Sequence, residues 1–188
     1  MGKVNKRIIF KFAEGLENIL NTCPICGRKH TITTKKNKVL CEHCGYLTAM
    51  NGRYEFDTGF RFKNLAQWYD WQKSLLQEEI TQNADYVLSS PVELRMRGSG
   101  KEMTRRSGFG TCTLNREGLT YSGTKDGETV TLHFPLQRIY RLLFGAGVNF
   151  EVYDGTEIFF FVPEEKRSNV DWYLASMILH DDAGPTAQ

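Results

Sequence analysis

The sequence predicts an α+β protein in which a small cysteine-rich module and a linking helix precede a seven-stranded antiparallel sandwich or barrel with a C-terminal helix. Two Cys-x-x-Cys-Gly pairs lie close together in the first quarter of the chain, and an amphipathic helical pattern follows them. From about residue 86, short β-prone runs recur at roughly 10-residue spacing between turn signals. These observations divide the chain into an N-terminal segment with the cysteine module at 1–55, a linking helix at 60–83 and a strand-rich domain at 86–182.

Composition and charge exclude several classes of protein. Of the 188 residues, 24% are charged and 40% are hydrophobic, as in soluble globular proteins. The formal net charge of +2 is too small to predict a polyanionic partner by itself. The sequence has no apolar run of about 18 residues that would span a membrane, and the apolar stretch near its N-terminus is too short for a signal peptide. Four of the five cysteines are clustered, which does not fit a secreted disulfide framework, so we expect a cytoplasmic protein.

The cysteine module has the pattern of a metal site. Gly27 and Gly45 follow the two cysteine pairs directly, and a tight turn across Cys-x-x-Cys needs a residue that adopts positive φ. Two such turns can present four thiolates tetrahedrally to Zn²⁺, and the β-prone segments between them predict a hairpin. With four protein ligands the site is closed, and therefore structural rather than catalytic. The sequence predicts a zinc ribbon with the ligands Cys23, Cys26, Cys41 and Cys44.

Other interpretations of the cysteines and histidines are weaker. A redox-active Cys-x-x-Cys needs a thioredoxin-like βαβ setting, and none follows here. His30 and His43 lie nearby, but the cysteines already fill four coordination positions, so we expect both to be surface residues. Cys112 lies inside a predicted strand, where we expect it to be a small buried apolar residue.

The linking helix is predicted by the stretch FKNLAQWYDWQKSLLQEEITQ, whose apolar residues recur at helical spacing. Asn64 can cap its N-terminus, with Gln67 three residues later. We expect Trp68 and Trp71 to be packing residues rather than parts of a ligand cage.

Seven predicted strands and a final helix make up the rest of the chain. Pro163 ends the last strand, and Ser168 is the predicted N-cap of a helix with one apolar face. The predicted strands cover residues 90–97, 108–115, 118–123, 129–134, 138–145, 148–154 and 156–162.

This pattern resembles a pleckstrin-homology (PH) domain or the related GRAM-like domains, which implies a barrel. The resemblance is carried by GTCTLNREGLTYSG, FPLQRIYRLLF, FEVYDGTEIFFFV and the Trp172-bearing helix. Such domains commonly bind lipid headgroups or peptides near their first hairpin, which here is ELRMRGSGKEMTRR. Its basic residues can hold a phosphate or an anionic lipid; the alternatives are a solvated loop that keeps a strand edge soluble, or a protein-binding surface. The candidate residues are Arg95, Arg97, Lys101, Arg105 and Arg106.

The order of the segments resembles the C-terminal extension of some bacterial 1-acylglycerol-3-phosphate acyltransferases. There, a segment similar to AEGL leads into a ribbon similar to CPICG…CEHCG, and a helix similar to WYDWQ follows. Such enzymes use a His-x-x-x-x-Asp pair, but here the residues five positions after the four histidines are Lys35, Thr48, Arg138 and Pro185. The resemblance therefore implies a non-catalytic region of phospholipid synthesis. It would act with an acyltransferase domain in cis or trans, peripherally at the inner membrane face.

Two further functions remain open. Basic residues on the predicted hairpin (Arg28, Lys29, Lys35, Lys36 and Lys38) are typical of a ribbon that binds nucleic acid, although the hairpin lacks interleaved aromatic residues on which bases can stack. An independent enzyme is the less favoured alternative, because the sequence offers no nucleophile–base pair, no phosphate loop and no open metal site.

Overall fold

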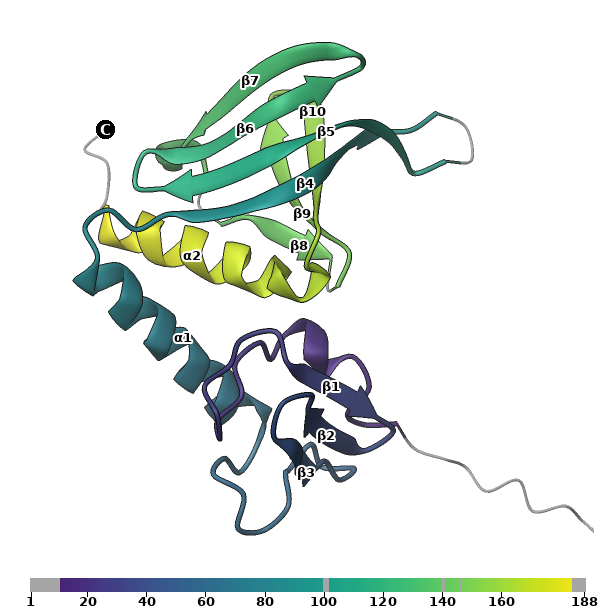
Figure 1. Ribbon diagram of the computed structural model, residues 1–188, viewed down its shortest axis with the longest axis vertical. Helices are drawn as coiled ribbons and strands as arrows, with labels where there is room; N and C mark the ends of the chain where they lie inside the picture. The colour runs from purple at the N-terminus through teal and green to yellow at the C-terminus, as the bar shows by residue number, and fades with distance from the viewer. Residues whose placement is uncertain (1–10, 100–101, 140, 146, 184–188) are drawn as a thin grey trace, which may run out of the picture. The chain divides into compact units, whose positions relative to one another are not determined.

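The computed structural model describes residues 11–99, 102–139, 141–145 and 147–183 (Figure 1). The chain forms two compact units, Met1–Trp71 and Gln72–Gln188, here called unit 1 and unit 2. Unit 1 contains a three-stranded antiparallel sheet, and unit 2 contains a seven-stranded antiparallel sheet with a C-terminal helix. The predicted α+β class is therefore confirmed.

Three short strands and one 3₁₀ turn form the framework of unit 1. The first two strands pair with each other as the hairpin predicted between the two cysteine pairs. The third strand follows the second cysteine pair, outside the predicted hairpin, and pairs with the other side of β2. The bounds are η1 Leu16–Asn18, β1 Ile32–Lys35, β2 Lys38–Cys41 and β3 Gly45–Ala49.

The predicted linking helix is present as α1, Leu65–Gln82, and the boundary between the units falls inside it. The Asn64 side chain accepts a hydrogen bond from the backbone N–H of Gln67, at an Oδ1···N distance of 3.1 Å. The Gln67 side chain in turn accepts one from the backbone N–H of Lys63, at 2.7 Å. This reciprocal arrangement supplies acceptors for two backbone N–H groups at the helix start, so the predicted N-cap is confirmed.

Aromatic rings complete the core of unit 1. Trp68 is fully buried, stacks on Phe62 with ring centroids 5.9 Å apart, and donates a hydrogen bond from Nε1–H to the carbonyl oxygen of Thr22 at 3.0 Å. The Trp71 ring lies 5.4 Å from that of Phe62, so both tryptophans are packing residues, as predicted. The buried members of this core are Ala13, Leu16, Leu20, Cys23, Ile32, Val39, Cys41, Met50, Phe56, Phe62 and Trp68.

The sheet of unit 2 consists of two meanders joined through one central strand pair. β4 to β7 form the first meander and β8 to β10 the second, and β10 pairs with β4, so the spatial order is β7-β6-β5-β4-β10-β9-β8. The bounds are β4 Leu88–Arg97, β5 Thr104–Asn115, β6 Gly118–Lys125, β7 Glu128–Pro135, η2 Leu136–Arg138, β8 Leu143–Gly145, β9 Asn149–Asp154 and β10 Glu157–Pro163.

This sheet curls but stays open. The rings of Phe134 on β7 and Phe159 on β10 lie 5.2 Å apart between centroids, although their strands are not neighbours in the sheet. Among the described residues, β7 and β8 have no strand partner on their outer sides. The seven strands β4 to β10 therefore form one antiparallel sheet that matches the predicted barrel only loosely.

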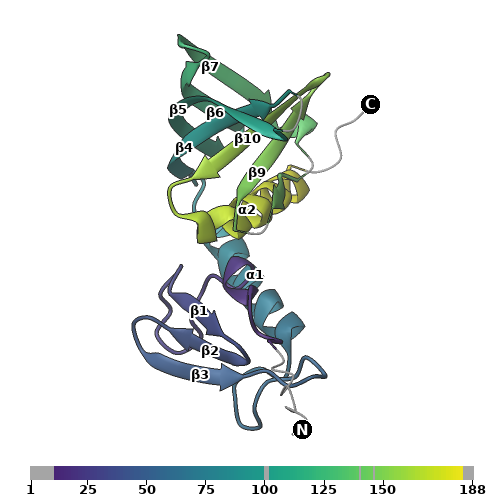
Figure 2. The ribbon, with the colours of Figure 1, turned by 90° about the vertical axis from the view of Figure 1, so that its right-hand side faces the viewer.

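The helix α2, Asn169–Asp182, lies against one end of the curled sheet (Figure 1 and Figure 2). Trp172 on α2 stacks on Phe150 of β9 with ring centroids 4.5 Å apart, and both side chains are fully buried. Cys112 on β5 is fully buried as well, which confirms its predicted role as a core residue.

The prediction of a strand over 138–145 is wrong for most of its length. Among the described residues of that range, only β8 at its end is a strand, and η2 covers its start. Leu136, Ile139 and Leu142 are all buried, and their three-residue spacing differs from the alternation of a strand.

Ser168 occupies the N-cap position of α2, as predicted, but its side chain makes no capping hydrogen bond. A 3₁₀ turn, η3 Lys166–Ser168, precedes α2, and the Glu165 side chain accepts a hydrogen bond from the backbone N–H of Arg167 at 3.0 Å. Ser168 has helical backbone angles because it is also the last residue of η3, which runs directly into α2. Its buried Oγ has no hydrogen-bond partner among the described residues.

Two glycines allow β5 and β6 to approach closely. Gly110 and Gly123 are paired across these strands. A Cβ atom at Gly110 would collide with the carbonyl oxygen of Ser122, and one at Gly123 with the carbonyl oxygen of Phe109. The strands can therefore keep this spacing only with glycine at both positions.

Candidate metal centre

Two tight turns carry the four cysteines of unit 1. In the first, the backbone N–H of Gly27 donates to the carbonyl oxygen of Cys23 at 2.9 Å. The second connects Cys41, the last residue of β2, to Gly45, the first residue of β3. Gly27 has a φ of 71° and Gly45 a φ of 89°, so both have the left-handed conformation that the sequence pattern predicts.

The four thiols converge on one point. All Sγ atoms of Cys23, Cys26, Cys41 and Cys44 lie within 4.8 Å of one another. The Cys23–Cys44 and Cys26–Cys41 sulfur distances are 3.5 and 3.8 Å, and all four residues are free thiols. A tetrahedral ion with metal–sulfur bonds of about 2.3 Å requires sulfur–sulfur distances of about 3.8 Å, whereas a disulfide bond is about 2.0 Å long. The described cluster therefore has the dimensions of a four-thiolate metal site.

Hydrogen bonds around the cluster favour the thiolate form at Cys41. Burial alone would raise the pKa of this thiol, but the Thr31 hydroxyl and the backbone N–H groups of Cys44 and His43 lower the pKa to about 6. Burial raises the pKa of Cys23. The described cluster contains only the four cysteines, so neither His30 nor His43 belongs to it.

Arg61 connects the first cysteine turn to the aromatic core, a role that the sequence pattern did not indicate. Its Nη1 donates to the carbonyl oxygen of Pro24 at 3.4 Å. Its guanidinium carbon lies 4.6 Å from the ring centre of Trp71 and 5.2 Å from that of Phe62. The guanidinium group thus supports the backbone between Cys23 and Cys26.

The basic hairpin predicted to bind an anion is partly neutralised within the protein. Arg95 and Arg106 are paired across β4 and β5, and Glu93 binds both. The distances are 2.5 Å from Arg95 Nε to Glu93 Oε1 and 2.9 Å from Arg106 Nη2 to Glu93 Oε2. Burial would raise the pKa of Glu93, but the hydrogen bonds from the two arginines hold it below its ordinary value.

Arg105 points to the opposite face of β5 from its neighbour Arg106. It binds Asp126 through Nη1 at 2.5 Å and through Nη2 at 3.1 Å, and the Ser107 hydroxyl donates to the same carboxylate at 3.0 Å. These bonds lower the pKa of Asp126 to about 2. Arg97 forms no ion pair with any described residue, and Lys101 lies outside the described residues. The five candidate residues therefore do not form one cluster of free cations.

None of the helices in the described ranges is both long and apolar enough to cross a lipid bilayer. No protein-family model matches the chain, and no curated protein matches it. One solved structure is similar to this chain, with 14% identity and a TM-score of 0.29. Its description concerns mutations in SsgB that correlate to longitudinal cell division during sporulation of Streptomyces coelicolor. The match covers 55% of this chain and 94% of the other. A TM-score of this size is too low to carry an argument about fold or function.

Proposed function

We propose that this chain is a non-catalytic accessory region that combines a structural zinc site with a PH-like ligand-binding unit. The observation that supports this proposal best is the cluster of four free thiols with mutual distances suited to one tetrahedral ion. Four protein ligands leave no coordination position for a substrate, so an ion held there stabilises the fold rather than performing chemistry.

Zinc is the ion that this site suits best. Soft thiolate ligands in a tetrahedral set are typical of Zn²⁺ or of iron centres, and two glycine-containing turns joined by a short hairpin are typical of zinc. Elemental analysis of the purified chain should find one zinc per molecule, and Cys44→Ser should lower that content. Iron in place of zinc, or a folded unit 1 without metal, would contradict the proposal.

The number and order of elements in unit 2 support the PH-like assignment. Seven antiparallel strands followed by a C-terminal helix are the elements that the resemblance to a PH domain implies. A unit of this type binds anionic lipid or a protein partner, and Arg97 is the described hairpin cation that has no acidic partner.

Vesicle sedimentation tests the lipid side of this proposal. The chain should bind vesicles containing phosphatidylglycerol more tightly than phosphatidylcholine vesicles, and Arg105→Ala with Arg106→Ala should weaken that binding. Glu93 and Asp126 offset much of the hairpin charge, so we expect weak binding that salt suppresses. Equal binding to both vesicle types, unchanged by the substitutions, would rule out the lipid role.

The proposed biological setting is phospholipid synthesis, where the region would hold or regulate a 1-acylglycerol-3-phosphate acyltransferase domain at the inner membrane face. The support for this setting is the order of the AEGL segment, the ribbon and the WYDWQ helix. Adding the purified chain to such a catalytic domain should change its acyl-transfer rate or its membrane association. Two proteins that neither co-purify nor affect each other would remove this part of the proposal.

Nucleic-acid binding by the ribbon is a second candidate function, favoured by one face of the small sheet. Strand pairing puts Lys35 opposite Lys38 and Leu40 opposite Tyr46, and the Tyr46 side chain is exposed. Lys38 lies two residues before Leu40 on β2, so it shares a face with Tyr46. The Tyr46 hydroxyl donates to Asp57. This exposed ring and lysine are a minimal surface for a stacked base and its phosphate. Filter binding of single-stranded DNA should then fall steeply with salt and with Tyr46→Ala.

A further inference from the structure

Two hollows on unit 2 adjoin each other and share Val162 and Lys166; together they are here called the β10 groove. Their volumes are about 380 and 390 Å³, each within the range of ligand sites. The first is lined by Pro91, Val92, Glu93, Phe109, Gly110, Val162, Pro163, Glu164 and Lys166. The second is lined by Arg95, Met103, Thr104, Gly147, Val148, Asn149, Glu151, Phe160, Val162 and Lys166.

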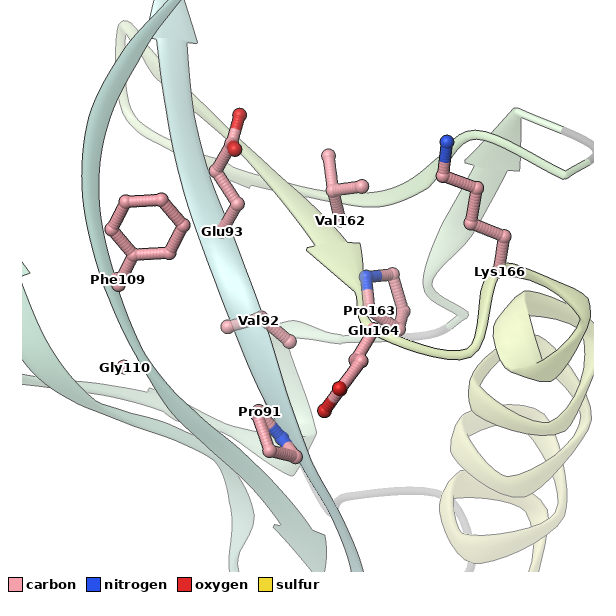
Figure 3. A pocket seen from close by; sticks show the side chains of 9 residues that line it. All are labelled: Pro91, Val92, Glu93, Phe109, Gly110, Val162, Pro163, Glu164 and Lys166. Carbon is pink, nitrogen blue, oxygen red and sulfur yellow. The ribbon is translucent and has the colours of Figure 1, made fainter.

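Strand register produces this groove. Val162 on β10 is paired with Glu93 on β4, and Glu93 is paired with Phe109 on β5, so the three side chains form a row on one face of the sheet. Figure 3 shows this row, with Lys166 beyond Val162. Pro163 ends β10 and the chain turns into η3, which places the Lys166 side chain at the junction of the two hollows.

Exposed apolar side chains line the β10 groove. Phe109 is 55% exposed, Val148 58% and Met103 88%. Phe109 lines the first hollow, with the guanidinium carbon of Arg106 5.1 Å from its ring centre. Met103 and Val148 line the second. Isolated exposed apolar residues are common, but three along one groove favour a binding surface. Val162 and Phe160 add half-buried apolar area to the same face.

The charges of the groove argue against a phosphate headgroup as its ligand. Arg95 is bound by Glu93. Two further carboxylates line the groove, Glu164 in the first hollow and Glu151 in the second. The Glu151 carboxylate accepts hydrogen bonds from Asn149 and Tyr153. Lys166 is the lining cation without an ion pair to a described residue. One ammonium group at the junction of the two hollows matches a single carboxylate, whereas a phosphorylated headgroup needs a cluster of unpaired cations, and the neighbouring carboxylates of Glu151 and Glu164 would repel its several charges.

We propose that the β10 groove binds an extended peptide segment of a partner protein, in which apolar side chains on both sides of one acidic residue fill the two hollows. The acidic residue pairs with Lys166, and one apolar side chain packs on Phe109. An extended chain suits two adjoining hollows because its side chains are spaced to enter them separately. This inference rests on the proposed role of unit 2 as a binding module and specifies its partner.

Selection from a library of short random peptides on the full chain tests the inference. The selected peptides should share an acidic residue flanked by apolar ones. Fluorescence anisotropy with labelled synthetic peptides then gives Kd values for the native chain and its variants. Phe109→Ala should weaken binding about tenfold, the size of a moderate hot-spot contact. Lys166→Glu should weaken binding of the acidic peptide and strengthen binding of a peptide in which lysine replaces the acidic residue.

Matched variants separate groove effects from general ones. Val87 is 53% exposed, close to the 55% of Phe109, but lines neither hollow, so Val87→Ala should leave Kd unchanged. Arg97→Glu reverses an exposed charge outside the groove and controls for Lys166→Glu. The four replaced side chains are largely on the surface, and equal melting temperatures would confirm that the variants fold.

Several outcomes would overturn the inference: selection that yields no binder, peptides that bind Phe109→Ala as well as the native chain, or a charge swap at Lys166 that does not change peptide preference. Binding of short-chain anionic lipid that Phe109→Ala abolishes would also contradict it, because the occupant would then be a lipid. Zinc content and vesicle binding are separate measurements. A chain that contains zinc but binds no peptide would leave the proposed function standing and overturn this inference. A chain that binds peptide but contains no zinc would overturn the proposed zinc site and leave this inference standing.

Discussion

The two units of this chain reach a stable core by different means. In unit 1, two of the four clustered cysteines, Cys23 and Cys41, are themselves members of the buried core. In unit 2, the core consists of large side chains from many strands and α2, including Trp172, Phe150 and Phe161, and the described residues contain no second cluster of metal-ligating groups. We therefore expect unit 1 to depend on the ion proposed for its four thiols, whereas we expect unit 2 to fold on burial of apolar surface alone.

Removal of a metal ligand should give the largest difference between the units. Binding of structural zinc contributes about 10–16 kcal/mol in small zinc-finger peptides, more than a core of this size can replace. Cys41→Ser, or chelation of the native chain, should therefore unfold unit 1 and leave unit 2 folded. Residue-resolved NMR should show collapsed amide dispersion for residues 11–71 with little change in the strands of unit 2.

A matched control replaces the cysteine that lies outside the cluster. Cys112→Ala should keep full metal content and lower only the stability of unit 2. Native-like amide signals for unit 1 after complete metal removal would show that the two units do not differ in this way.

The two buried tryptophans differ in whether the indole N–H has a hydrogen-bond acceptor in the described part of the chain, which gives a second comparison of the two units. Trp68→Phe removes the donor to Thr22 and leaves a buried carbonyl without a partner, which should lower the stability of unit 1 by about 2–3 kcal/mol. Trp172 has no hydrogen-bond partner for Nε1 among the described residues. Trp172→Phe should therefore cost unit 2 only the lost packing, about 1 kcal/mol. Urea unfolding, followed separately by spectroscopic signals from unit 1 and unit 2, measures the stability loss in each variant. Equal stability losses in the two variants would refute the difference in hydrogen bonding between the two tryptophans.

In unit 2, a Cβ added at a glycine should lower stability more where it collides with a neighbouring strand than where it only strains a left-handed backbone. Gly123→Ala places a Cβ against the carbonyl oxygen of Phe109, and we expect a loss of about 2 kcal/mol. Gly127 has a φ of 89° with nothing within 4 Å of an added Cβ, so Gly127→Ala should cost only the left-handed conformation, about 1 kcal/mol. Thermal unfolding of the two variants gives the comparison. A larger loss at Gly127 would contradict it.

The smallest expected effect is a loss of stability of unit 2 at acidic pH. The pKa of Asp126 is lowered to about 2 by Arg105 and Ser107, below the ordinary value of about 3.9. Because the folded-state pKa is lowered, the contribution of this group to stability is present above about pH 4 and is lost as the pH falls through about 2. NMR titration of the Asp126 carboxyl carbon should show the low midpoint, and Arg105→Ala should move the midpoint upward. An unchanged midpoint in that variant would show that the ion pair is not its cause.

Local features of both units could be predicted from the sequence. The four cysteines and their glycines are short-range signals, because ligand spacing and positive φ are set within a few residues. The cap at Asn64 and the buried Cys112 followed from equally local patterns.

What the sequence did not indicate depends on register between distant strands. Asp126 lies 21 residues from Arg105, and only the fold of β5 and β6 brings them together, so the hairpin was expected to be more cationic than it is. The failed strand over 138–145 has buried residues at three-residue spacing, which an apolar run alone does not distinguish from a strand. The β10 groove combines side chains of β4, β5 and β10 and was not predicted for the same reason.

The position of Cys112 gives the chain a built-in reference for sulfur chemistry. Its thiol is fully buried, and burial raises its pKa well above the ordinary value. Alkylating reagents attack thiolates, so brief treatment of the native protein should modify only the sulfurs of unit 1. An ion bound by those sulfurs blocks the reagent, and the added mass on intact chains therefore reports the fraction of molecules that carry it.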